Sequence, residues 1–195
     1  HKEKTNPLLF VLFLSSSFFF SFKSSSMNEL PQHEFLIGIA KADITGPIAE
    51  QSFIGYGKPR QIASGLHMRL FAKSFVIQEN RKGFRKKIVI VICDLAFITE
   101  SLLHEVKQKI TQLQKRGLLE GISYENLALM ATHTHSGPGG FAKQPLYGSG
   151  VGFNKKYMDH LSHGIVQSIL EAHKNMEKGR IYFHSKKLLG ASFNR

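Results

Sequence analysis

The chain has 195 residues, of which 42% are hydrophobic and 21% charged, and this composition excludes an intrinsically disordered body. Its length is enough for one domain with a buried core, or for part of a larger domain. The formal net charge of +12 indicates solvated basic loops or attraction to an anionic surface. Because no nucleic-acid motif accompanies the charge, we favour a membrane surface over nucleic acid as the partner.

Residues 1–26 have the pattern of a targeting segment. Lys2 and Lys4 precede the apolar run 8–14, and serines recur from there to Ser26. A basic start, a short apolar core and small residues near the end are typical of a secretory signal peptide. The apolar run is short for a membrane span, and a signal anchor stays open. We therefore expect a secreted, extracellular or membrane-associated protein; an internal start at Met27 is the alternative.

The rest of the chain covers residues 27–195. Three strands and a helix are predicted in its first part. The strands cover 35–45, 70–78 and 87–94, and the third is apolar on both faces, as a central buried strand is. It contains the single cysteine of the sequence, which we expect to be a buried apolar side chain. The helix has Thr99 as its N-cap and ends at Gly117.

The next predicted strand covers 127–132. Strand, helix and strand at this spacing form a βαβ unit, whose two strands are parallel. A second amphipathic helix is predicted over 155–175 and a last strand over 180–185. The fold class is therefore α/β, with mixed sheets and flanking helices.

Two histidines follow the apolar run 127–130 and precede the glycine-rich loop 136–140. Ligands of α/β folds collect at the carboxyl ends of strands, where this pair and Asp94 both fall. Since residues i and i+2 of an extended chain point to one face, His133 and His135 are expected to face one space. Neutral imidazole is a common zinc ligand, and a His-x-His at a strand end is a usual beginning of a metal site. A polar strand end without a metal is the alternative.

Several blocks of the sequence resemble the N-terminal part of neutral ceramidases. They are 39–47 (Ile-Ala-Lys-Ala-Asp-Ile-Thr-Gly-Pro), 55–56 (Gly-Tyr), 63–72 (Ala-Ser-Gly-Leu-His-Met-Arg-Leu-Phe-Ala), 131–140 (Ala-Thr-His-Thr-His-Ser-Gly-Pro-Gly-Gly) and 194–195 (Asn-Arg). Their order and spacing also match, over residues 35–195. The resemblance implies a zinc amidase that cleaves the N-acyl bond of ceramide to give sphingosine and a fatty acid. It also implies a larger layered α/β/β/α zinc hydrolase domain, of which this chain is an N-terminal fragment, truncated at its C-terminus.

The resemblance implies Zn²⁺ as the cofactor and gives individual residues their expected roles. His133 matches the family histidine that binds zinc, and His135 matches a neighbour of the metal that contacts substrate. Arg195 matches an arginine at the rim of the active site. The candidate substrate-binding residues are His67 and the loop glycines Gly137, Gly139 and Gly140, which let the chain pass close to a ligand.

The other zinc ligands of the family are a second histidine, a glutamate and a tyrosine, and they lie downstream of the matched region. We expect them, and the family's serine motif, from sequence beyond Arg195, so this chain carries only the first part of a site. Ceramide and a membrane surface are the expected partners.

Two alternatives stay open. The first is an inactive truncated fragment that only binds lipid surfaces. The second is a different metal hydrolase with a His-x-His pair, such as an amidohydrolase barrel. In that barrel the pair lies on the first strand, whereas several strands precede it here, and this counts against the second alternative.

Overall fold

The computed structural model describes residues 34–55, 58, 60–81, 83, 86–144, 152–183 and 185–191. The predicted signal segment and Arg195 lie outside these residues. Two units are distinguished, and residues 34–179 form the larger one. The described residues of the other unit, 180–183 and 185–191, contain no helix or strand.

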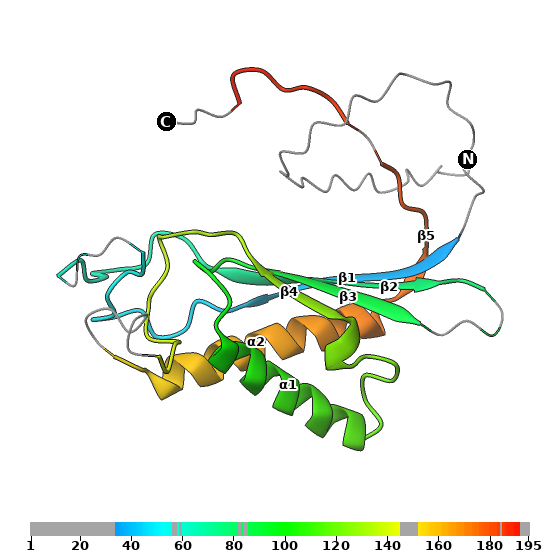
Figure 1. Cartoon of the computed structure of the whole chain (residues 1–195), viewed down its shortest axis with the longest axis horizontal. Coiled ribbons are helices and arrows are strands. Elements are labelled where there is room, and N and C mark those ends of the chain that lie inside the picture. The colour runs from blue at the N-terminus through cyan, green and yellow to red at the C-terminus, as the bar shows by residue number, and fades with distance from the viewer. Residues whose placement is uncertain are drawn as a thin grey trace, which may run out of the picture. The chain divides into compact units, whose positions relative to one another are not determined.

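A mixed sheet of five strands is the framework of the larger unit, with the order β4-β3-β2-β1-β5 (Figure 1). The strands are β1 (Phe35–Asp43), β2 (Phe71–Glu79), β3 (Lys87–Cys93), β4 (Leu127–Ala131) and β5 (Glu177–Gly179). β3 and β4 are parallel, as predicted, and the other neighbours pair antiparallel. The first four strands confirm the predicted ones to within two residues at each end.

The prediction of a last strand over 180–185 is wrong, because β5 covers Glu177–Gly179 instead. Gly179 pairs with Phe35, the first residue of β1, so the chain runs past the end of its partner strand after that point. The aromatic and β-branched residues of 181–183 favoured a strand, but strand propensity needs a neighbouring strand to act on.

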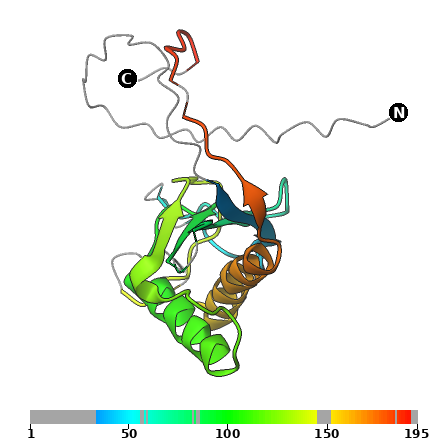
Figure 2. The same ribbon diagram turned by 90° about the vertical axis from the view of Figure 1, so that its right-hand side faces the viewer.

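Both α-helices cover the same face of the sheet (Figure 2). They are α1 (Glu100–Lys115) and α2 (Lys155–Lys174), and a short 3-10 helix, η1 (Tyr124–Asn126), leads into β4. Thr99 caps α1 as predicted, since its side chain accepts a hydrogen bond from the Leu102 amide, and Asn154 caps α2 in the same way. Between helices and sheet lies the core, whose buried strand residues are Ala72, Val76, Val89, Val91 and Cys93.

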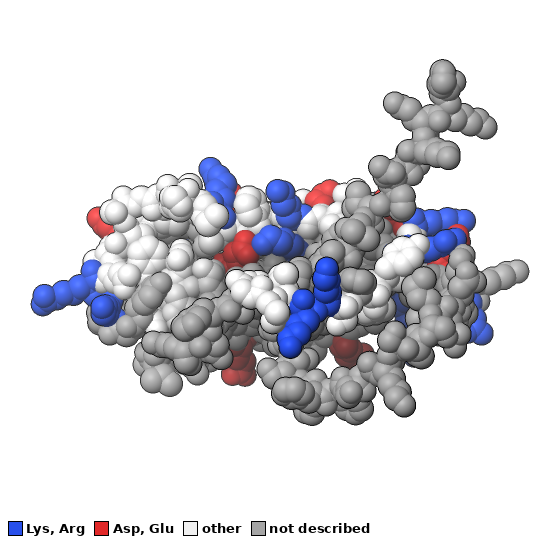
Figure 3. Space-filling model, turned by 90° about the horizontal axis from the view of Figure 1, so that it is seen from above, with Lys and Arg blue, Asp and Glu red and all other residues white. Residues whose placement is uncertain are grey.

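The opposite face of the sheet is less covered by the described residues. On β3, Val89 and Val91 are fully buried against the helices, whereas Ile88 points the other way and is 57% exposed. The prediction that β3 is buried on both faces is therefore right for one face only. Seen from this side, Lys and Arg side chains are spread between uncharged areas (Figure 3). Lys73 belongs to this face, and its ammonium pairs with the Asp94 carboxylate at 2.8 Å.

The architecture confirms a mixed α/β fold with flanking helices. An open sheet in which three of the four strand pairs are antiparallel is not a parallel amidohydrolase barrel, which excludes that alternative for the described part of the chain. In the same part of the chain, no helix combines the length and the hydropathy that crossing a bilayer requires.

Candidate functional site

The two histidines lie where the parallel strands β3 and β4 end side by side. The Thr132 amide donates to the Cys93 carbonyl at 2.9 Å and so extends the ladder by one residue. His133 then adopts φ of +62°, in the left-handed region that residues other than glycine rarely enter. The chain therefore turns at His133 instead of continuing as a strand. The prediction that both rings face one space through extended geometry has the wrong cause, although the rings do lie together.

The contacts of His133 define which ring nitrogen carries its proton. Nδ1 lies 2.7 Å from the Ala96 carbonyl oxygen, which can only accept, so Nδ1–H donates and Nε2 keeps its lone pair. His135 Nε2 lies 3.3 Å from that nitrogen and donates to it, with the ring centroids 4.8 Å apart. His133 is exposed and His135 half-buried. Both Nε2 atoms thus meet at one accessible point.

This donor set fits the beginning of a zinc site. A metal-binding histidine usually donates its second N–H to a carbonyl or carboxylate, which orients the ring, and the Ala96 carbonyl does so for His133. The described residues contain no group of three histidine, cysteine, aspartate or glutamate side chains that could hold a metal ion. His133 therefore suits one ligand position of a metal site.

The loop that follows the histidines is fixed on two sides. On one side the Gly139 amide donates to the Ser52 carbonyl at 2.8 Å, next to a bridge between Phe53 and Pro138. On the other side the hydroxyl of Thr99, the N-cap of α1, donates to the Phe141 carbonyl at 3.2 Å. The loop is thereby held between the 51–55 segment and the start of α1.

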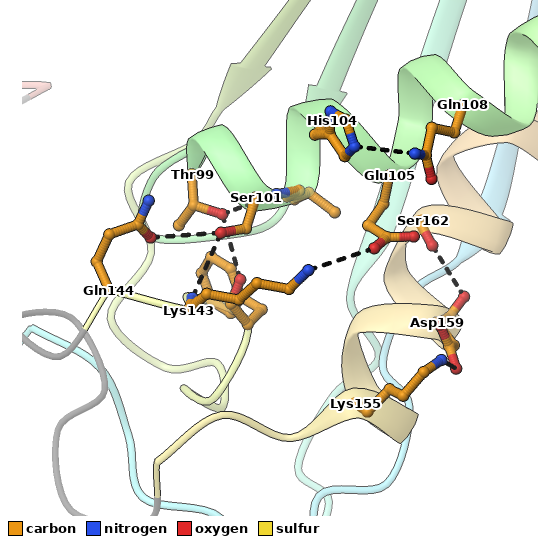
Figure 4. Close-up of polar contacts among 12 residues, drawn as sticks. Thr99, Ser101, His104, Glu105, Gln108, Lys143, Gln144, Lys155, Asp159 and Ser162 are labelled. Atoms are coloured by element: carbon orange, nitrogen blue, oxygen red, sulfur yellow. Dashed lines mark hydrogen bonds and ion pairs between the residues drawn. The ribbon is translucent and has the colours of Figure 1, made fainter.

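Further polar side chains surround the hydrogen bond between Thr99 and the Phe141 carbonyl (Figure 4). The Ser101 hydroxyl accepts from the Lys143 amide and donates to the Gln144 side-chain oxygen, both at 3.4 Å. The Lys143 ammonium also lies 3.7 Å from the Glu105 carboxylate. This last pair is largely solvated and contributes little, so the anchor depends mainly on the hydroxyl groups.

The loop glycines are buried against their own chain. An added Cβ would lie 3.1 Å from Leu70 Cδ1 at Gly137, 3.2 Å from the Ser52 carbonyl at Gly139, and 3.2 Å from the Gln51 side-chain oxygen at Gly140. An added side chain would have to displace these neighbours by a few tenths of an ångström, so packing within the protein favours glycine here. Their contact with substrate stays a prediction.

Two other residues considered from the sequence lie apart from the histidine contacts. His67 is exposed on the segment that precedes β2, and its role in binding substrate stays a prediction. Asp94 accepts from the Phe71 amide at 3.0 Å and from the Lys73 ammonium, so it joins β2 to β3. Burial raises the pKa of the neighbouring Cys93 to about 12, which makes this thiol a poor nucleophile.

The Ala96 carbonyl is a site group that the sequence could not reveal. Any residue except one that distorts the backbone would present the same oxygen, so no side-chain signal marks the position. Only the path of the chain after β3 brings this carbonyl to His133.

Known proteins similar to this chain were found by sequence and by structure. The family model described as "Neutral/alkaline non-lysosomal ceramidase, N-terminal" matches residues 35–195. Neutral ceramidase A of Dictyostelium discoideum is 35% identical over 191 residues, which is 96% of this chain and 26% of the relative. Neutral ceramidase of Pseudomonas aeruginosa is 37% identical over 163 residues, covering 83% of this chain and 23% of the relative.

Two solved structures share the fold. The crystal structure of neutral ceramidase from Pseudomonas aeruginosa has a TM-score of 0.67 and 36% identity, covering 75% of this chain and 22% of that one. A ceramidase complexed with C2 has a TM-score of 0.68 and 36% identity, covering 74% and 22%. The chain thus spans only about a quarter of the length of the proteins that it matches.

Proposed function

Because this chain belongs to the neutral/alkaline non-lysosomal ceramidase family, we propose that the protein containing it hydrolyses the N-acyl bond of ceramide to sphingosine and a fatty acid. The observation that carries the proposal is the His133 geometry, which lies inside the matched region. The ring is oriented through Nδ1–H, and its Nε2 lone pair, which accepts from His135 in this structure, is the one that would bind a metal. That one similar structure is a ceramidase complexed with C2 supports the substrate class.

We assign His133 as one zinc ligand, with Zn²⁺ as the cofactor. When bound, zinc supplies Lewis acidity: it polarises the amide carbonyl and lowers the pKa of water to about 7. The Ala96 carbonyl keeps the His133 ring oriented. His135 Nε2–H, which donates to His133 Nε2 in this structure, would be left to donate to an oxygen of the substrate when that lone pair binds the metal. Arg195, outside the described residues, is assigned a similar role at the rim.

The larger layered α/β/β/α zinc hydrolase domain belongs to the same proposal. Ile39 and Ile88 lie on the sheet face opposite the helices and are 37% and 57% exposed. Full burial of an exposed isoleucine stabilises by about 1.5–3 kcal/mol, so at these exposed fractions each side chain forfeits roughly 0.5–1.7 kcal/mol. A second sheet on this face would recover that free energy, and the greater length of the relatives leaves room for it. The remaining zinc ligands are assigned to that same region.

The proposed partners are ceramide and a membrane surface, and not nucleic acid. Ceramide resides in membranes, and the formal net charge of +12 favours approach to an anionic lipid surface. A secretory signal or signal anchor over residues 1–26 is consistent with an extracellular or membrane-associated location.

Mass spectrometry on ceramide micelles tests the proposed reaction. Protein expressed from its complete coding sequence should release sphingosine and free fatty acid in equal amounts. Binding of ceramide vesicles without either product would favour the alternative of an inactive lipid-binding protein. Release of neither product, with cleavage of other amides instead, would refute the assigned substrate.

A further inference from the structure

The segment 51–55 forms a support beneath the histidine loop. Ser52 is fully buried and Ile54 is 4% exposed, so this segment is fixed although it has no regular secondary structure. Its backbone pairs with the loop through Phe53 and Pro138 on one side, and with Ile62 through Ser52 on the other. The end of the segment, Gly55, is thereby held at a defined distance from the histidines.

Gly55 lies directly against the ring of His135. A Cβ added to Gly55 would be 2.4 Å from His135 Nδ1 and 2.5 Å from Cε1, closer than real Cβ atoms come to other heavy atoms. On its other side the same ring presents Nε2 to His133 at 3.3 Å. The His135 ring is therefore enclosed between the Gly55 backbone and His133.

The backbone conformation also favours glycine at this position. The φ angle of Gly55 is +101°, which L-residues rarely adopt. Gly83 has a similar angle, +81°, but open space where its Cβ would be. Comparing the two glycines separates the effect of backbone strain from the effect of contact with His135.

We propose that Gly55 is a positioning residue for His135. The missing side chain leaves the room in which the ring of His135 can approach His133. Any side chain at position 55 would turn the ring away and separate the two Nε2 atoms. The consequence for catalysis rests on the proposed function, whereas the contact between Gly55 and His135 does not depend on it.

The contact between Gly55 and the His135 ring can be tested by nuclear Overhauser effects at the ring protons of His135. The sample is the whole chain with labelled histidines. The wild type should show one effect from the Gly55 Hα protons to His135 Hε1, and another between the His133 and His135 rings. Gly55→Ala should lose the effect between the rings, and the control Gly83→Ala should keep it. If the wild type lacks the Gly55 effect, or Gly55→Ala keeps the ring contact, the proposal is wrong. The wild-type measurement decides even if the variant does not fold.

A double-mutant cycle tests the consequence in protein from the complete coding sequence. Gly55→Ala should lower the rate of ceramide hydrolysis by about 10- to 100-fold, because misplacing a site group by about 1 Å has effects of that size. In the His135→Ala background the same change should cost clearly less, because the ring is gone and only the backbone strain at position 55 remains. Equal losses in both backgrounds would show that Gly55 acts without His135. An inactive wild type would refute the proposed function. It would not affect the nuclear Overhauser test of the contact between Gly55 and His135.

Discussion

Replacing Thr99 by valine removes the one hydroxyl that both caps α1 and fastens the loop behind the histidines. Thr99 is 5% exposed, accepts from the Leu102 amide at 3.0 Å and donates to the Phe141 carbonyl at 3.2 Å. Valine has nearly the same shape as threonine but no hydroxyl, so both hydrogen bonds are lost with little change in packed volume.

The expected loss of unfolding free energy follows from these two bonds. Removing a threonine N-cap costs about 1 kcal/mol. Leaving a buried carbonyl without its donor costs about 1–3 kcal/mol more. Thr99→Val should therefore lower the free energy of unfolding by about 2–4 kcal/mol, measured by urea denaturation. Hydrogen exchange should also become faster at the amide of Gly139, because its loop loses one of two anchors.

Thr111→Val is the matched control. The Thr111 hydroxyl is exposed and donates to the Lys107 carbonyl within the same helix, so this change should stay within about 0.5 kcal/mol. A Thr99→Val loss of about 1 kcal/mol or less, with unchanged exchange at Gly139, would show that the Phe141 bond contributes nothing and that the loop is held otherwise.

Three further outcomes follow from burial, from titration and from the donor set. Ile165→Ala, at a fully buried position of α2, should lower the free energy of unfolding by about 2–5 kcal/mol in urea denaturation. Ile88→Ala, on the exposed face of the sheet, should lower it by less than about 1 kcal/mol. Equal losses would contradict a core that lies on one side of the sheet. Burial lowers the pKa of His173 below its usual 6.5, so its contribution to stability is complete above that pH and is lost as the pH falls. His173→Gln should therefore flatten the decline in unfolding free energy as the pH falls below about 6.5, and an unchanged slope would refute this. Calorimetry on residues 27–195 should show only weak zinc binding, and tight one-to-one binding would mean that the chain holds more ligands than His133.

Most of the framework was predictable because it depends on local signals. Period-two and apolar runs marked the first four strands, and Thr99 together with its helical repeat located α1. The parallel pairing of β3 and β4 followed from the length of the connection between them. β5 could not be located this way, since its three residues pair only because Phe35–Ile37 lie opposite.

The site was predictable in its residue types but not in its geometry. His133 and His135 stood out by spacing, yet the left-handed turn at His133 and the carbonyl of Ala96 depend on the path of the chain. Gly55 appeared in the sequence only as part of a resembling block, because its contact with His135 joins residues 80 positions apart. Such contacts leave no periodic or compositional trace.

Zinc content and ceramide hydrolysis of His133→Ala, expressed from the complete coding sequence, test the central claim most directly. His163→Ala is the control, since His163 is an exposed residue of α2. We predict that His133→Ala loses bound zinc and at least about 100-fold of the hydrolysis rate, while the control keeps both. A His133→Ala protein that retains stoichiometric zinc and full hydrolysis would contradict the assignment of His133 as a zinc ligand.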